Sequence, residues 1–199
     1  STNVINPNEV QLVLDKKIIS LNGQRFTSGM TYIPGESIEY QIVVSNTSSS
    51  YATDINLNDL VSSVTTNLVN SESDQALENW SVTIDSSADV RNTVSPNKVP
   101  QNTDINLTLG IAPDSQIILT IDATIKENAA GIISPNIATI HSNGTTISSS
   151  TLPINPTLGE ISIKKTTFQK FYEPSQNIGY EIVVSNSSNG WAVGVEVND

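Results

Sequence analysis

The sequence predicts an all-β fold in which two antiparallel sheets face each other. Apolar and polar residues alternate with a period of two over much of the chain, as in strands with one buried and one exposed face. The polar residues are chiefly serine, threonine and asparagine, which favour strands and turns over long helices. A segment near residue 32 also recurs near residue 172, so one unit is expected to be followed by the start of another.

Each stretch of alternation between turn residues is expected to be one strand. The first runs from Leu12 to Ile18 and the second from Ile38 to Val44. Further strands are expected near 52–61, 79–85, 104–110, 116–126, 136–142 and 145–152. The last two flank Asn143-Gly144, a pair that favours a two-residue hairpin turn. About eight strands fit an immunoglobulin-like β-sandwich.

The repeat is ungapped over residues 32–59 and 172–199. Identical residues in the first copy include Tyr32, Pro34, Ile38, Tyr40, Ile42, Val43, Val44, Ser45, Asn46, Ala52, Asn58 and Asp59. They recur as Tyr172, Pro174, Ile178, Tyr180, Ile182, Val183, Val184, Ser185, Asn186, Ala192, Asn198 and Asp199. Upstream, 12–16 align with 161–165 after an insertion placed near 22–29. Pro153, Pro156 and Gly159 mark the boundary, so we expect a complete repeat over 1–155 and the N-terminal part of a second over 156–199, with three strands within 160–199.

Four segments resemble one known family of surface repeats. They are Tyr32-x-Pro34-Gly35-Glu36-x-Ile38-x-Tyr40-x-Ile42-Val43-Val44-x-Asn46, the stretch 52–59, Ala112-Pro113-Asp114-Ser115 and Asn136-Ile137-Ala138-Thr139-Ile140. Over nearly all of 10–152 the chain is similar to the repeat catalogued as domain of unknown function 11. The resemblance implies immunoglobulin-like repeats strung together in large surface proteins, adhesins and stalks of bacteria and archaea. The sequence departs from the pattern at Ser175, which replaces the turn glycine, and in a long Ser/Thr-rich segment after Asp59.

Composition narrows the environment and the partners. The formal charge of −11 argues against nucleic acid as a partner. With no cysteine, disulfides and thiolate zinc sites are excluded. No apolar run is long enough for membrane insertion within this segment, and Ser1, with no preceding leader, suggests a mature or excised chain. We therefore expect an extracellular location, on a cell surface or in a surface filament.

Three polar residues share strand faces with apolar residues and should point into the core. Strand parity places Lys16, Asp59 and Asn136 inward. A buried lysine loses its charge readily, and a buried carboxyl can donate a proton to an amide oxygen. The three residues can therefore form a Lys16–Asn136 isopeptide bond, a kind of crosslink known in related surface repeats. In the alternative reading Lys16 reaches solvent at the rim of the sandwich while Asp59 and Asn136 close turns.

The remaining candidate residues have weaker support. Lys165 and Asp199 are the second-copy equivalents of Lys16 and Asp59. Weak calcium candidates are Asp54, Asn56 and Asn58, whose spacing differs from that of an EF-hand and which otherwise form a solvated face; no other cofactor is expected. Glycosylation sequons begin at Asn46, Asn79, Asn106, Asn143 and Asn186. Trp80, Trp191 and Tyr51 are either an exposed sugar platform or packing residues.

The sequence predicts a structural protein rather than an enzyme. His141 is the only histidine, and no nucleophile turn or phosphate loop accompanies it. The leading hypothesis is a load-bearing spacer or adhesive module whose partners are neighbouring repeats or identical subunits. One alternative is a module that binds a glycan, a host protein or a matrix ligand through loops such as 86–103 and 22–31. Another is a filament subunit that assembles by strand exchange.

Overall fold

The computed structural model describes residues 9–67, 75–192 and 194–199, which divide into two compact units. Unit 1 ends at Asn155 and unit 2 begins at Pro156. No helix in these three ranges is long and apolar enough to cross a membrane. The one helical segment in these ranges is a single 3-10 turn, η1 (Val61–Ser63).

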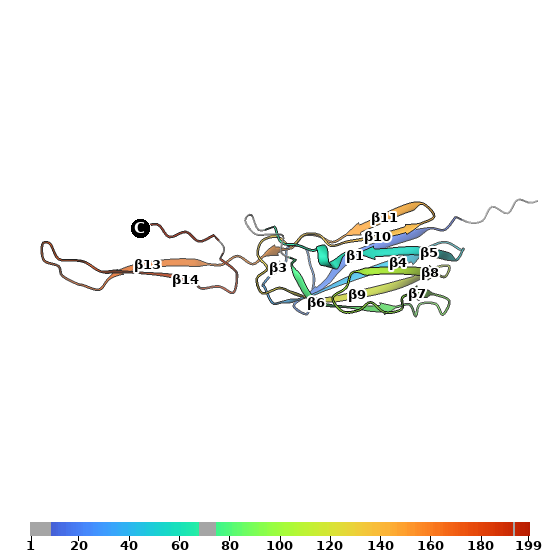
Figure 1. Ribbon diagram of the computed structural model, residues 1–199, viewed down its shortest axis with the longest axis horizontal. Coiled ribbons are helices and arrows are strands. Elements are labelled where there is room, and N and C mark those ends of the chain that lie inside the picture. Colours follow the sequence, from blue (N-terminus) through green and yellow to red (C-terminus); the bar gives the residue numbers. More distant parts are fainter. Residues whose placement is uncertain (1–8, 68–74, 193) are drawn as a thin grey trace, which may run out of the picture. The chain divides into compact units, whose positions relative to one another are not determined.

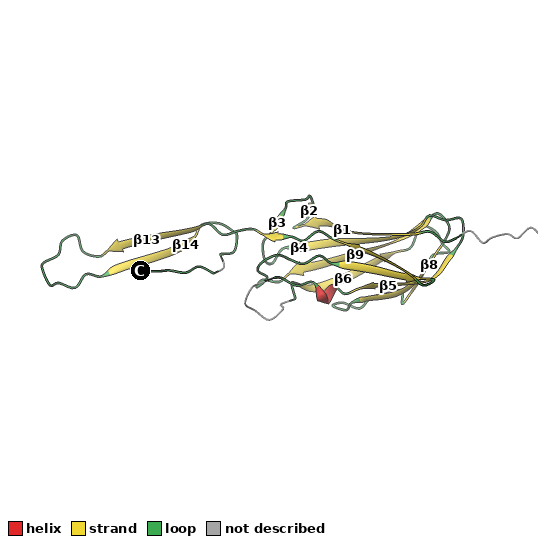
Figure 2. Cartoon of the chain, turned by 90° about the horizontal axis from the view of Figure 1, so that it is seen from above, coloured by secondary structure: helices red, strands yellow, loops and turns green. Residues whose placement is uncertain are grey.

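Unit 1 consists of two five-stranded antiparallel sheets (Figure 1). The first has the order β2 (Gln24–Arg25), β1 (Leu12–Leu21), β4 (Ser37–Asn46), β9 (Ser115–Ile125), β6 (Leu77–Asp85). The second has the order β11 (Thr145–Ser150), β10 (Ile137–Ser142), β5 (Ala52–Asp59), β8 (Ile105–Ile111), β7 (Thr93–Ser95). Figure 2 shows the two sheets as facing layers.

This arrangement confirms the predicted all-β, immunoglobulin-like sandwich. The neighbours β1-β4-β9-β6 correspond to strands A-B-E-D of that fold, and β11-β10-β5 to strands G-F-C. The chain departs from the variable-type order because it visits β6, at the edge of the first sheet, before it lays down β8 beside β5. Strand β1 still lies beside β11 of the last hairpin. The backbone N–H of Lys16 in β1 donates to Oγ of Ser149 in β11, 2.9 Å away.

The core between the sheets is built from the inward residues of the alternating strands. In β4 every second residue is buried, and in β9 the buried positions alternate with outward ones in the same way. Tyr32 and Tyr40 are almost fully buried among these aliphatic residues. Trp80 is also buried, and its indole N–H donates to the carbonyl of Thr103 at 2.9 Å. Trp80 is therefore a packing residue rather than an exposed platform.

The structure also differs from the expected strands. The strand expected near 52–61 is shorter than that range, because β5 (Ala52–Asp59) stops at Asp59 and η1 follows. Short strands occur where none was expected, namely β2, β3 (Thr31–Tyr32), β7 and β12 (Asn155–Pro156), which pairs with β3. Strands of two or three residues have no room for a readable period, so alternation does not find them.

Unit 2 contains one antiparallel pair, β13 (Ile161–Thr167) and β14 (Tyr180–Asn186). Residues 160–199 thus hold two named strands rather than the three expected, since 192–199 contain no strand among the described residues. The equivalent segment in unit 1, β5, is hydrogen-bonded on both sides, by β8 and β10. No counterpart of those two strands lies within 156–199, so the segment lacks the partners that make it a strand.

Candidate crosslinking site

Lys16 lies in the middle of β1 on the face that looks into the sandwich. It stands opposite Ile42 of β4 in the strand register, and its neighbours on the same face are Leu14 and Ile18. Only 3% of Lys16 is exposed, and its side chain has no exposed area. The side chain therefore does not reach solvent at the rim.

Asp59 and Asn136 lie on adjacent strands of the opposite sheet. Asp59 is the last residue of β5 and stands opposite Ala138 of β10. Asn136 comes two residues before Ala138, so strand parity puts its side chain on the same face, diagonally across from Asp59. Asp59 and Asn136 are each 1% exposed. The structure thus turns all three predicted residues into the same interior.

The backbone around the site is tied together by the segment after β10. The backbone N–H of Asn136 donates to Oγ1 of Thr151 at 3.0 Å, and the backbone N–H of Thr151 donates to the carbonyl of Asn136 at the same distance. Two residues earlier, Oγ of Ser149 accepts the hydrogen bond from the backbone of Lys16. One short segment, 149–151, therefore fixes both β1 and Asn136.

Lys16 and Asp59 form a buried ion pair. Nζ of Lys16 contacts Oδ2 of Asp59, and neither side chain has exposed area. The ring of Tyr40, which lies on β4, has its centroid 5.7 Å from the same nitrogen. The ammonium group therefore has a carboxylate on one side and an aromatic face on another.

Burial changes the proton affinity of each of these groups. It lowers the pKa of Lys16 to about 8, against the opposing effect of the nearby Asp59. Burial raises the pKa of Asp59, with Lys16 opposing the rise and the negative charge of Asp104 adding to it. Burial, assisted by Asp59, also raises the pKa of Tyr40. The neutral forms of lysine and aspartic acid are both favoured relative to water.

The amide of Asn136 has no hydrogen-bond partner among the described residues. Both Nδ2 and Oδ1 of Asn136 are buried and unpaired, as is Oδ1 of Asp59. Buried polar groups in folded proteins are nearly always paired, because each unpaired one costs about 1–3 kcal/mol. The unpaired amide of Asn136 therefore lies in the same interior as a buried lysine and a buried acid.

Unit 2 repeats part of this constellation without burying it. Lys165 forms an ion pair with Asp199, and its Nζ lies 4.7 Å from the ring centroid of Tyr180. The side chains of Lys165 and Asp199 are 43% and 54% exposed. No counterpart of Asn136 lies within 156–199. The combination of lysine, aspartate and tyrosine therefore occurs in both units. It is buried in unit 1 and exposed to solvent in unit 2.

The weak calcium candidates lie on the outer face of the second sheet. Asp54, Asn56 and Asn58 are carried by β5 and are at least partly exposed. Asn56 already accepts a hydrogen bond from Thr108, with 3.3 Å between the two oxygens. In the described ranges no three histidine, cysteine or acidic side chains gather as metal ligands would. His141 is exposed on β10, with its Nδ1 2.8 Å from Oγ1 of Thr146.

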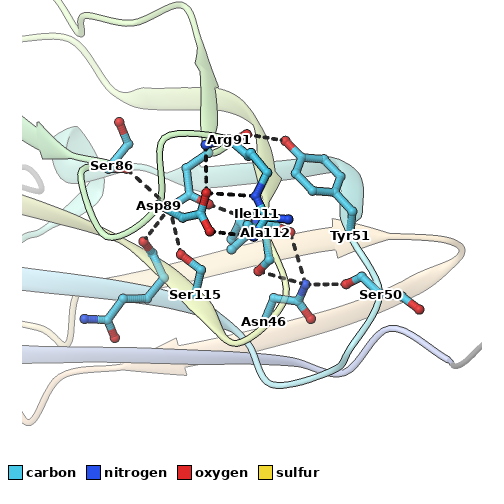
Figure 3. A network of polar contacts seen from close by, with 11 residues as sticks. Asn46, Ser50, Tyr51, Ser86, Asp89, Arg91, Ile111, Ala112 and Ser115 are labelled. Atoms are coloured by element: carbon cyan, nitrogen blue, oxygen red, sulfur yellow. Dashed lines mark hydrogen bonds and ion pairs between the residues drawn. The ribbon is translucent and has the colours of Figure 1, made fainter.

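The loop 86–103 is fixed by polar contacts rather than open (Figure 3). Arg91 hydrogen-bonds to Asp89 and lowers its pKa to about 2. The hydroxyl of Tyr51 donates to the carbonyl of Arg91 at 2.7 Å. Nδ2 of Asn92 donates to Oγ of Ser115 at 3.0 Å. Part of the loop pairs as β7, and the loop 22–31 likewise contains β2.

The five sequons differ in exposure. Asn46 is 1% exposed, and its Nδ2 donates to the carbonyls of Ser50, Ile111 and Ala112. Asn79, Asn106, Asn143 and Asn186 are exposed. Tyr51 and Trp191 are partly exposed and belong to different units. Asn46 is therefore a structural clamp in the folded protein, whereas the other four sequons remain accessible.

Asp104 and Ser62 border the site and have no recognisable pattern in the sequence. The backbone N–H and the hydroxyl of Ser62 donate to the two carboxylate oxygens of Asp104, each at 2.8 Å. Ser62 belongs to η1, which is separated from Asp59 by Leu60 alone, and Asp104 directly precedes β8. The two residues are 42 positions apart, so only the folded topology brings them together.

Comparisons with known proteins find only remote likenesses. No protein-family model and no curated protein matches it. A family 123 glycoside hydrolase from Clostridium perfringens shares 16% identity over 72% of this chain and 27% of its own, with a TM-score of 0.37. The pilus backbone protein RrgB from Streptococcus pneumoniae shares 16% identity over 67% and 32%, with a TM-score of 0.35. The chain thus spans under a third of the length of these proteins, and likenesses this remote do not bear on what it does.

Proposed function

We propose that this chain is a structural segment of an extracellular surface or filament protein, and that unit 1 is a load-bearing spacer closed by an amide bond between Lys16 and Asn136. The observation that carries the proposal is the buried Lys16–Asp59 pair, which shares its interior with a buried Asn136 amide that has no partner. The resemblance of the sequence to stalk and adhesin repeats agrees with this role.

The reaction balances without any added reagent. Lys16 passes a proton from its ammonium group to the carboxylate of Asp59. The neutral Nζ attacks Cγ of Asn136 while Asp59 hydrogen-bonds to the amide oxygen. The Nζ–Cγ bond forms, the Cγ–Nδ2 bond breaks, and Nδ2 leaves as ammonia with a proton from Nζ. Asp59 ends as the neutral acid, the form that its burial favours.

The bond would supply the covalent reinforcement that a chain without cysteine lacks. It would join β1 to the segment that enters β10, and thus link the two facing sheets. An amide bond also differs from a disulfide in being unaffected by thiols. An extracellular protein under tension gains from such a link because a pulling force cannot extend the bridged part of the chain without breaking a covalent bond.

Intact mass under denaturing conditions tests the proposal. We expect the folded chain to be lighter than its sequence by one ammonia, and a protease digest to contain one branched peptide that joins Lys16 to Asn136. Lys16→Ala and Asn136→Ala should each restore the sequence mass. Lys165→Ala is the matched control, because it removes the exposed second-copy lysine, and it should keep the loss. An unshifted mass in folded wild-type protein rejects the bond, and loss of water instead would indicate a Lys16–Asp59 bond.

A ligand-binding module is the second candidate function. The observation in its favour is an open cleft of about 430 Å³ beside the polar network of Figure 3. Its lining residues are Ser45, Asn46, Thr47, Ala88, Asp114, Ser115 and Gln116. A glycan or protein array in which Asp114→Ala abolishes a hit, while Asp15→Ala on the exposed face of β1 keeps it, would support recognition. An array without hits on folded protein would favour the spacer.

Neighbouring repeats or identical subunits are the partners we propose for unit 2. Its inner face exposes Ile163, Tyr180 and Val184, whose unit 1 counterparts Leu14, Tyr40 and Val44 are buried. Light scattering over a dilution series tests whether copies of this chain supply the cover. Association that is lost on dilution supports it, and a monomer at all concentrations contradicts it.

A further inference from the structure

The turn that follows Asp59 is held by a pair of hydrogen bonds. After Asp59 the chain leaves β5 and forms η1 (Val61–Ser63), in which Val61 is fully buried. Ser62 donates from both its backbone N–H and its hydroxyl to Asp104. Asp104 is next to Ile105, which stands opposite Asp59 in the pairing of β5 with β8. The carboxylate of Asp104 therefore fixes the chain immediately beyond Asp59.

The same carboxylate is a charged neighbour of Asp59. The groups that face Asp59 are Lys16 from β1, Tyr40 from β4 and Asp104 from the start of β8. His141 of β10 is exposed on the outer face and does not belong to this set. Asp104 precedes Ile105, the residue opposite Asp59, and its negative charge raises the pKa of Asp59. This charge therefore favours a proton on the Asp59 carboxyl.

We propose that Asp104 is a positioning residue for the Lys16–Asn136 crosslink, which orients Asp59 through Ser62 and holds the shared proton on the Asp59 carboxyl. The proposal rests on the crosslinking function proposed above. A neutral amine and a protonated Asp59 are what the attack on Cγ of Asn136 requires. After ammonia has left, no ammonium group balances Asp59, and the charge of Asp104 keeps Asp59 neutral.

The test is the rate of crosslinking as a function of pH. The protein is first isolated in an unfolded form that has not crosslinked, and it is then refolded by dilution. Samples are quenched in acid at successive times, and the crosslinked fraction is measured from the intact mass. Asp104→Asn keeps an oxygen for the Ser62 N–H but removes the charge. We expect a rate about tenfold lower, equivalent to one pKa unit, with the acid limb of the pH–rate profile moved to lower pH because that limb follows the protonation of Asp59. Ser62→Ala should slow the reaction while its limbs stay in place.

Asp85→Asn is the matched control, because Asp85 accepts the same two hydrogen bonds from Ser87 at the far end of β6. It should react with the wild-type rate and profile. If Asp104→Asn fails to refold, Asp104→Ser provides the same charge removal. Wild-type rate and limbs in a folded charge-removal variant overturn the role of Asp104. A wild-type chain that never loses ammonia overturns the proposed function instead, so the two failures are distinguishable.

Discussion

At the scale of single residues, the Lys16–Asp59 pair is stable only as a pair. Taking two charges out of water costs several kcal/mol per ion, and their attraction returns this only when the geometry is good. Burial lowers the pKa of Lys16 and raises that of Asp59, so each residue alone would prefer to be neutral. Removal of one partner therefore leaves the other with a penalty that depends on pH.

The variant Lys16→Met makes this penalty measurable. It leaves Asp59 buried without a counter-charge, and we expect a loss of about 3–5 kcal/mol in the free energy of unfolding near neutral pH relative to Asn136→Ala, which keeps the ion pair and also lacks the proposed bond. The folded-state pKa of Asp59 lies above its ordinary 3.8, so the folded state binds more protons than the unfolded state between these values. Stability should therefore rise as the pH is lowered toward 3.8 and fall as the pH is raised through the folded pKa.

Urea denaturation at several pH values measures this dependence. The double variant Lys16→Met, Asp59→Leu is the control, because it has no buried titrating group at this position. It should lack the extra pH dependence of Lys16→Met. If both variants respond to pH in the same way, Asp59 does not carry the penalty.

Which residues face inward could be predicted from the sequence, but their partners could not. Alternation with a period of two assigns each residue of a strand to a face, and Lys16 and Asn136 lie on the faces it assigned. Asp104 and Ser62 were missed because their contact depends on β5 and β8 pairing across 42 residues. No local period reports such a contact.

At the scale of elements, the end of β4 is held by one side chain. Asn46 donates to three carbonyls and accepts from both the backbone N–H and the hydroxyl of Ser48, at 3.1 and 2.7 Å. These contacts tie β4 to the end of β8 and to the loop before β5. In unit 2, Asn186 keeps the bond to Gly190 and the contacts with Ser188.

Asn46→Ala should lower the free energy of unfolding of unit 1 by about 3 kcal/mol, because it leaves buried carbonyls unpaired. The midpoint of chemical denaturation, followed by the fluorescence of the buried Trp80, reports the change. Asn186→Ala is the matched control in unit 2 and should leave this transition in place. Equal shifts for the two variants would show that the clamp is not specific to unit 1.

The elements themselves were predictable in proportion to their length. The long strands β1, β4 and β9 have enough residues to display alternation, whereas β2 and β7 do not. The expected third strand of unit 2, at 192–199, shows that alternation alone does not ensure a strand, since none forms among the described residues there. The segment repeats residues of β5 but not its neighbours, and a strand depends on the hydrogen bonds that neighbours supply.

At the scale of the whole molecule, the proposed bond determines how much chain a pulling force can release. It would join Lys16 to Asn136, so residues 17–135 would lie inside a closed loop. Force applied through the chain on either side of unit 1 would pass through the bond instead of unravelling that loop. Extension would then be restricted to residues outside 17–135.

Single-molecule force spectroscopy on a tethered chain measures this difference. Unfolding of Lys16→Ala should release the loop and add ~40 nm of contour length, at ~3.4 Å per residue, relative to the wild type. Lys165→Ala should behave as the wild type, since Lys165 lies outside the loop. A wild-type extension as long as that of Lys16→Ala would contradict the closed loop.

The burial of Asn46 has a consequence for the timing of modification. An oligosaccharide-transferring enzyme can reach the Asn46 sequon only while the chain is unfolded, because the folded sandwich buries the amide that would carry the sugar. A glycan attached to Asn46 before folding would prevent the end of β4 from packing in the sandwich. In a host that performs this modification, the fraction of chains glycosylated at Asn46 would therefore indicate how often glycosylation preceded folding. The four exposed sequons can be modified before or after folding, so their glycosylation carries no such information.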